Sequence, residues 1–192
     1  MRLALPVAIL VALLTGQAAL ADAKPPPKPD YVAKGEAAQA VSRKVRHHDV
    51  QPFAALDETA PLGRAWSSSS FYALRDDTGG RRWVVRRAWG NLSGAGGLVW
   101  ADSRTCPAVA AMLKGMEALT LRPDVPGLGA EDLKPPSTDP GLYAFWSYQA
   151  VSEGGGWIMG LSATGDHASP LARWWNVAGR ELAKCWTEQE PG

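Results

Sequence analysis

The side chains best suited to acid–base or nucleophilic chemistry are few and widely separated in this 192-residue chain. Asp102 follows an apolar run, and His167 lies in a polar stretch between two serines. Hydrolases combine a histidine with a carboxylate or a serine, provided that the side chains converge in space. Asp102 and His167 are therefore the candidate catalytic residues. Each also has a simpler interpretation, because Asp102 can cap a helix and His167 can be an ordinary loop residue.

Cys106 is the candidate for thiol chemistry. It lies at the predicted start of a helix, where the helix dipole and free backbone N–H groups stabilise a thiolate. The alternative is a structural disulfide with Cys185, the second of the two cysteines. An even pair of cysteines in an exported chain favours the disulfide.

Two further motifs suggest ligand chemistry but have simpler explanations. His47 and His48 precede Asp49, yet neighbouring side chains diverge on a helix or strand and chelate a metal poorly, so we expect a solvated charged turn. The glycine-rich stretch Asn91–Gly97 joins two predicted strands and lacks the G-K-[ST] of a phosphate-binding loop. The sequence therefore predicts no metal site and no cofactor.

The nine tryptophans are the remaining sign of a binding site. Five of them fit inward-facing stripes and are expected in the core: Trp83, Trp89, Trp100, Trp157 and Trp175. Exposed aromatic rings can stack against sugar or peptide. Trp66 and Trp146, together with Arg82 and Arg86, are the candidate ligand-binding residues. Together with Arg87, the two arginines could flank a groove for an anionic ligand, or they could keep one face of a sheet soluble.

The N-terminus predicts export. Arg2 precedes an apolar run, Leu3–Leu14, and small residues follow with cleavage expected near Ala21 or Ala23, which is typical of a secretory signal peptide. An apolar run of about 12 residues is too short to span a bilayer about 30 Å thick. We expect a periplasmic or secreted chain with no stable membrane insertion. The net charge of +1 gives no general attraction for nucleic acid.

The chain divides into a signal peptide at 1–23, a tether and poorly defined segment at 24–65, and a folded domain at 66–192. The sequence KPPPKPD at Lys24–Asp30 is expected to be extended, either as a spacer or as a docking ligand. A helix is predicted over Tyr31–Val45, and Gln51–Arg64 is expected to be irregular linking chain.

The domain itself alternates predicted strands with two helices. The strands are Ser67–Leu74, Arg81–Trp89, Leu98–Trp100, Leu142–Val151 and Trp157–Ala163, and the helices follow Cys106 and Ser169. The proline-rich stretch Arg122–Pro140 is expected to lie over a surface groove. The fold class is α+β: an antiparallel sheet of about five strands with two helices packed on one face and one Cys106–Cys185 disulfide. An antiparallel helix pair would bring the two cysteines together.

Three functional classes remain open from the sequence. A non-enzymatic binding or interaction domain of the cell envelope, with a protein or glycan as partner, ranks first because no catalytic set is evident. A hydrolase acting on an envelope polymer through Asp102 and His167 is the alternative. A thiol-redox protein using Cys106 is the second alternative. The sequence does not decide whether the protein is an enzyme.

Overall fold

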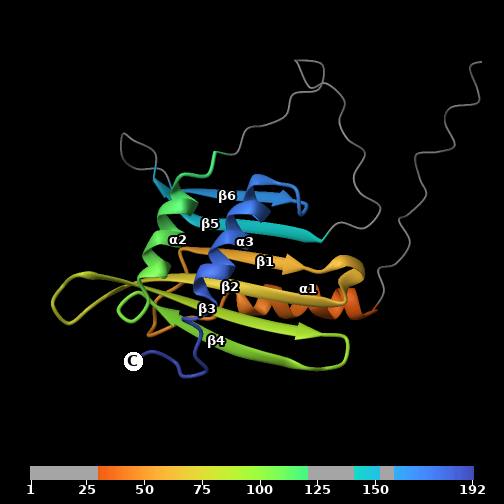
Figure 1. Cartoon of the computed structure of the whole chain (residues 1–192), viewed down its shortest axis with the longest axis horizontal. Helices are drawn as coiled ribbons and strands as arrows, with labels where there is room; N and C mark the ends of the chain where they lie inside the picture. The colour runs from red at the N-terminus through yellow and green to blue at the C-terminus, as the bar shows by residue number, and fades with distance from the viewer. Residues whose placement is uncertain (1–29, 121–140, 152–157) are drawn as a thin grey trace, which may run out of the picture.

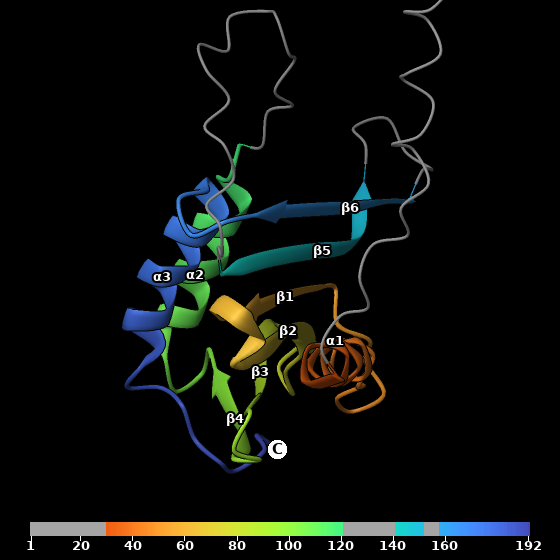
Figure 2. The same ribbon diagram turned by 90° about the vertical axis from the view of Figure 1, so that its right-hand side faces the viewer.

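A six-stranded antiparallel sheet with helices on both faces forms the centre of the computed structural model, which describes residues 30–120, 141–151 and 158–192 (Figure 1). In chain order the elements are α1 (Asp30–Ser42), β1 (Ala54–Thr59), the 3₁₀ turn η1 (Pro61–Gly63), β2 (Ala65–Arg75), β3 (Arg81–Asn91), β4 (Gly96–Asp102), α2 (Pro107–Glu117), β5 (Leu142–Val151), β6 (Ile158–Gly165) and α3 (Pro170–Leu182). The strand order is β4-β3-β2-β1-β5-β6. Figure 2 shows α2 and α3 on one side of the sheet and α1 on the other.

The predicted α+β class is confirmed, but the expected counts of strands and helices are too low. The additional strand is β1, which lies between β2 and β5 in the middle of the sheet. Ala54, Ala55 and Leu56 are all fully buried, because helices cover both faces of this strand. A strand buried on both faces lacks the alternation that marks a half-exposed strand. The prediction of irregular linking chain over Gln51–Arg64 is therefore wrong, and the sheet extends N-terminal to residue 66.

The face covered by α2 and α3 holds the main apolar core. Its buried members include Leu56, Phe71, Val85, Val109, Met112, Phe145, Leu171, Trp175 and Leu182. The helix predicted after Ser169 is present as α3; it buries an apolar stripe, and the Ser169 hydroxyl caps it by accepting a hydrogen bond from the Ala172 N–H at 3.1 Å. The predicted disulfide between Cys106 and Cys185 is present, with a Cα–Cα distance of 5.7 Å. It joins the start of α2 to the residues that follow α3.

The corner between β4 and α2 differs in detail from the prediction. Asp102 does not cap α2. The N-cap is Cys106, without a side-chain hydrogen bond, and Pro107 opens the helix. Asp102 instead accepts a hydrogen bond from the Arg104 N–H at 2.9 Å, and the Ser103 hydroxyl accepts one from the Trp83 N–H at 2.9 Å. These side chains stabilise the turn itself.

Helix α1 packs on the opposite face through polar contacts. It buries Gln39 and Ser42 and leaves Val41 exposed. The Gln39 amide donates hydrogen bonds to the Glu58 carbonyl at 2.9 Å and to the Ser67 carbonyl at 3.1 Å. The thin apolar stripe in the sequence agrees with this arrangement, since the helix is held by specific hydrogen bonds and little apolar burial.

Several predictions concern residues outside the described part of the chain. These are the signal peptide with its cleavage near Ala21 or Ala23, the proline-rich segment that ends at α1, the stretch Arg122–Pro140 and the core position of Trp157. Within the described residues, none of the helices has the length and apolar character needed to cross a membrane.

Candidate ligand-binding cleft

One row of opposed residues crosses all six strands near an end of the sheet. From β6 to β4 it consists of Gly165, Tyr143, Glu58, Ser67, Trp89 and Gly97, each the register partner of the next. Residues that lie opposite one another in a sheet project from the same face. This row therefore lies on the face that carries α2 and α3, and we call it the cleft row.

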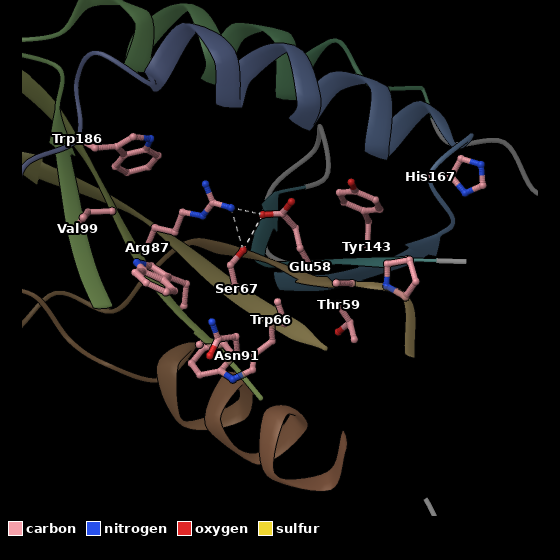
Figure 3. Close-up of a pocket in the computed structure, with 16 residues that line it drawn as sticks. Glu58, Thr59, Trp66, Ser67, Arg87, Asn91, Val99, Tyr143, His167 and Trp186 are labelled. Atoms are coloured by element: carbon pink, nitrogen blue, oxygen red, sulfur yellow. Dashed lines mark hydrogen bonds and ion pairs between the residues drawn. The ribbon is translucent and has the colours of Figure 1, made fainter. Parts of the chain in front are cut away.

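A cleft of about 880 Å³ opens above the cleft row (Figure 3). Its lining is mostly apolar and aromatic, with contributions from Trp66, Trp89, Val99, Pro61, Tyr143 and Trp186. Trp186 lies at one end of the cleft and His167 at the other (Figure 3). Trp186 is placed by its neighbours, because Cys185 is tied to Cys106 and Thr187 exchanges two backbone hydrogen bonds with Trp100 on β4.

The floor of the cleft carries a compact polar group formed by Glu58, Ser67 and Arg87. Glu58 Oε2 accepts hydrogen bonds from the Ser67 hydroxyl at 2.6 Å and from Arg87 Nη2 at 2.8 Å. The charges of Glu58 and Arg87 balance, so the floor is polar without a net charge. Among the described residues, Glu58 Oε1 has no hydrogen bond and the buried Nε of Arg87 has no partner. An acceptor and a donor are thus left for a ligand or for water.

Tyr143 supplies a phenol beside this polar group. Its hydroxyl donates a hydrogen bond to Asn176 Oδ1 on α3 at 3.4 Å. Burial, and secondarily the nearby carboxylate of Glu58, raises the pKa of Tyr143. The phenol therefore stays protonated at neutral pH and offers an aromatic ring with a hydroxyl group.

The indole rings of Trp66 and Trp89 explain the glycines at either end of the Asn91–Gly97 hairpin. A Cβ on Gly97 would lie 2.8 Å from Nε1 of Trp89, and a Cβ on Gly90 would lie 2.9 Å from Nε1 of Trp66. At both positions an indole ring from the opposed residue of the neighbouring strand fills the space that a side chain would need. Gly94 serves the turn itself, with φ of 81°.

The two indoles differ in exposure and in face. Trp89 is 40% exposed, although it lies on the same strand face as the buried Val85. Its predicted core position is therefore wrong. Trp66 is partly buried on the other face, where a Cβ on Gly35 of α1 would lie 3.2 Å from its ring.

Of the four residues predicted to bind a ligand, only Trp66 lines the cleft. Trp146 lies on the α1 side of the sheet, with the Arg43 guanidinium 3.9 Å from its ring centroid. Arg82 is buried and pairs with Asp102 at 2.9 Å, and Arg86 donates a hydrogen bond to the Ser42 hydroxyl at 2.8 Å. Both arginines hold internal polar contacts, so the alternative of a soluble sheet face is also wrong for them.

The structure does not bring Asp102 and His167 together. His167 lines the cleft. Asp102 lies on the other face of the sheet, where its register partner is Val84. Burial opposes the ionisation of Asp102, but hydrogen bonds from Arg104 and Arg82 outweigh it and lower the pKa of this carboxyl group. Asp102 is thus a paired carboxylate at the β4–α2 corner.

Cys106 and His47 are both buried inside the protein. Cys106 is 4% exposed and its sulfur is in the disulfide, so the structure offers no thiolate there. His47 is 1% exposed and packs against Trp100 at 4.8 Å between ring centroids, with Nδ1 2.8 Å from Glu190 Oε1. The predicted solvated turn is therefore wrong for His47. Within the described residues, no three His, Cys, Asp or Glu side chains gather in a way that could hold a metal ion.

The sequence alone does not single out Glu58, Ser67, Tyr143 or Trp186 as site residues. Glu58 lies on the strand that was not recognised. Arg87 had a usable signal, because it falls on the same face of its strand as Val85 and Trp89, where an arginine is out of place in a packed core.

Compared with known proteins, the chain matches no protein-family model, no curated protein and no solved structure.

Proposed function

We propose that this protein is an exported, non-enzymatic binding domain of the cell envelope, and that it holds a protein or glycan ligand in the cleft above the cleft row. The observation that carries the proposal is an open cleft of about 880 Å³ with the partly exposed indole of Trp89 over a polar floor. Ligand sites are typically concave and mostly apolar, with a few placed polar groups that fix orientation.

The polar floor supports binding better than catalysis. Glu58 is the one carboxylate in the described lining of the cleft, whereas glycoside hydrolysis generally uses a pair. The Ser67 hydroxyl donates its hydrogen bond to Glu58, and no hydrogen bond joins it to His167 within the described residues. An activated serine needs a base in contact with its hydroxyl. These contacts favour a role in recognition.

Export of the chain is supported by the sequence of its first 23 residues and is compatible with the disulfide. An envelope location would place the cleft among peptides and polysaccharides. Both ligand classes present apolar faces that can stack on indole rings and polar groups that can pair with Glu58 and Arg87.

The experiment uses the chain 24–192, its Trp89→Ala variant and a control variant, Val177→Ala, which changes a side chain that is 47% exposed on α3 and does not line the cleft. Soluble oligosaccharides, including N-acetylglucosamine trimers, and short peptides are titrated while acrylamide quenching of tryptophan fluorescence is measured. We expect at least one probe to protect the fluorescence of the unmodified chain and of Val177→Ala, and to lose its effect with Trp89→Ala. Binding that survives Trp89→Ala, or no binding in either class, would contradict the proposal.

A further inference from the structure

The proline-rich segment Lys24–Asp30 ends at the rim of the cleft. Helix α1 begins at Asp30, and its first turn contacts η1, where a Cβ on Gly63 would lie 2.7 Å from Val32 Cγ2 and 3.4 Å from the Tyr31 ring. Pro61, at the other end of η1, lines the cleft. The N-terminal end of α1 therefore lies next to a residue that lines the cleft.

The segment before α1 is short and rich in proline. Residues 24–29 precede α1, and in a polyproline II conformation six residues extend about 19 Å. The composition favours this conformation, because four of the six residues are proline.

The lining of the cleft has the chemistry that such segments bind. Polyproline II peptides dock in aromatic-lined grooves, where proline rings pack against indole and phenol rings. Trp89 and Tyr143 stand on the cleft row with the small Ser67 and the Glu58 carboxylate between them. A helix with three residues per turn places Pro26 and Pro29 on one face, so both rings can contact this surface.

The cleft also offers partners for an ammonium group. Lys24 and Lys28 are the only charged residues in 24–29, and both are cations. Glu58 has one carboxylate oxygen without a hydrogen bond among the described residues, and indole faces attract ammonium groups. A proline-rich segment with lysines thus matches both the aromatic rings of the cleft and the Glu58 carboxylate.

We propose that the cleft takes proline-rich, lysine-containing peptide, and that residues 24–29 of the same chain occupy it until a peptide of the same kind displaces them. The inference rests on the proposed function, since it requires the cleft to be a binding site. The intramolecular segment has an effective concentration in the millimolar range because its tether is short. A free peptide must compete with it.

The test compares the chain 24–192 with a variant in which Pro25, Pro26, Pro27 and Pro29 are replaced by serine. These substitutions lie outside the elements of the fold, and equal circular dichroism and melting curves verify that folding is unchanged. A fluorescent synthetic peptide, KPPPKPD, is titrated into both chains and followed by anisotropy, with KSSSKSD as the control peptide. We expect the serine variant to show greater acrylamide quenching and to bind KPPPKPD at least about tenfold more tightly than the unmodified chain.

A third variant combines the serine substitutions with Trp89→Ala and is expected to lose peptide binding. The inference is overturned if the serine variant and the unmodified chain show the same quenching and neither binds KPPPKPD, or if KSSSKSD binds equally well. Binding of an N-acetylglucosamine trimer that depends on Trp89, without peptide binding, would overturn this inference and leave the proposed function standing. Absence of binding by both probes would overturn both.

Discussion

Replacement of both cysteines by alanine tests the thermodynamic role of the disulfide. Cys106 and Cys185 are 79 residues apart in the sequence, and the closed loop contains α2, β5, β6 and α3. On the chain-entropy model, a cross-link over a loop of this length stabilises the folded state by about 4.5 kcal/mol. Domains are typically stable by roughly 5–15 kcal/mol, so the C106A/C185A variant is expected to be marginally stable. Its melting temperature should fall by about 9–18 °C.

Urea unfolding followed by circular dichroism measures both quantities that the model predicts. The midpoint should fall, and the slope of free energy against urea should rise, because an unfolded chain without the cross-link exposes more surface. The unmodified protein in strong reductant is the matched control and should reproduce the variant. A loss below about 1 kcal/mol with an unchanged slope would refute the reasoning, since the unfolded chain would then not be confined by the bond.

Three further outcomes follow from individual contacts. Gly90→Ala should destabilise the fold by about 1–3 kcal/mol in urea unfolding, because the new Cβ would lie 2.9 Å from the Trp66 indole. The control is Gly160→Ala, which lies in a strand with room for a Cβ and should change stability by less than about 0.5 kcal/mol. Trp175→Ala should cost about 3–5 kcal/mol in the same assay, since this side chain is 2% exposed in the core, and a cost near zero would contradict that packing. Burial lowers the pKa of His47 from 6.5, so the unfolded chain binds a proton that the folded chain does not, and stability should fall as the pH drops through 6.5 toward the folded-state pKa. The urea midpoint should therefore drop between about pH 7.5 and about pH 5, and His47→Phe should show a smaller drop.

The parts of the fold that the sequence predicted well are those with a strong local signal. Helix α3 has an apolar residue at every third or fourth position, a serine cap and a proline at its first position, and all three signals agree with its structure. The hairpin of β2 and β3 has alternating side chains and a polar turn at Asp76–Gly80. The pattern of α3 arises because one face is buried and the other is more open, whereas β2 is buried on both faces over Ser67–Tyr72 and the polar turn supplies the signal.

The missing strand shows the limit of such patterns. β1 has the sequence AALDET, which combines weak strand formers with two acids. Its acids have separate partners: Asp57 pairs with Arg43 on the α1 side, and Glu58 pairs with Arg87 on the α3 side. These partners come from distant parts of the chain, so no local window contains the reason why a charged hexapeptide lies at the centre of a sheet.

The cleft could not be predicted either, because the residues of the cleft row come from separate parts of the chain. Its six members come from six strands, and each is an ordinary strand residue in its own sequence context. Trp89 resembles a core residue because it lies on the same strand face as Val85, yet it is 40% exposed. Whether such a side chain is covered depends on tertiary packing. An aromatic residue at the end of a long strand is therefore a candidate for a ligand surface even when its stripe is apolar, and Arg87 on that same stripe was the signal that this end of the sheet is not core.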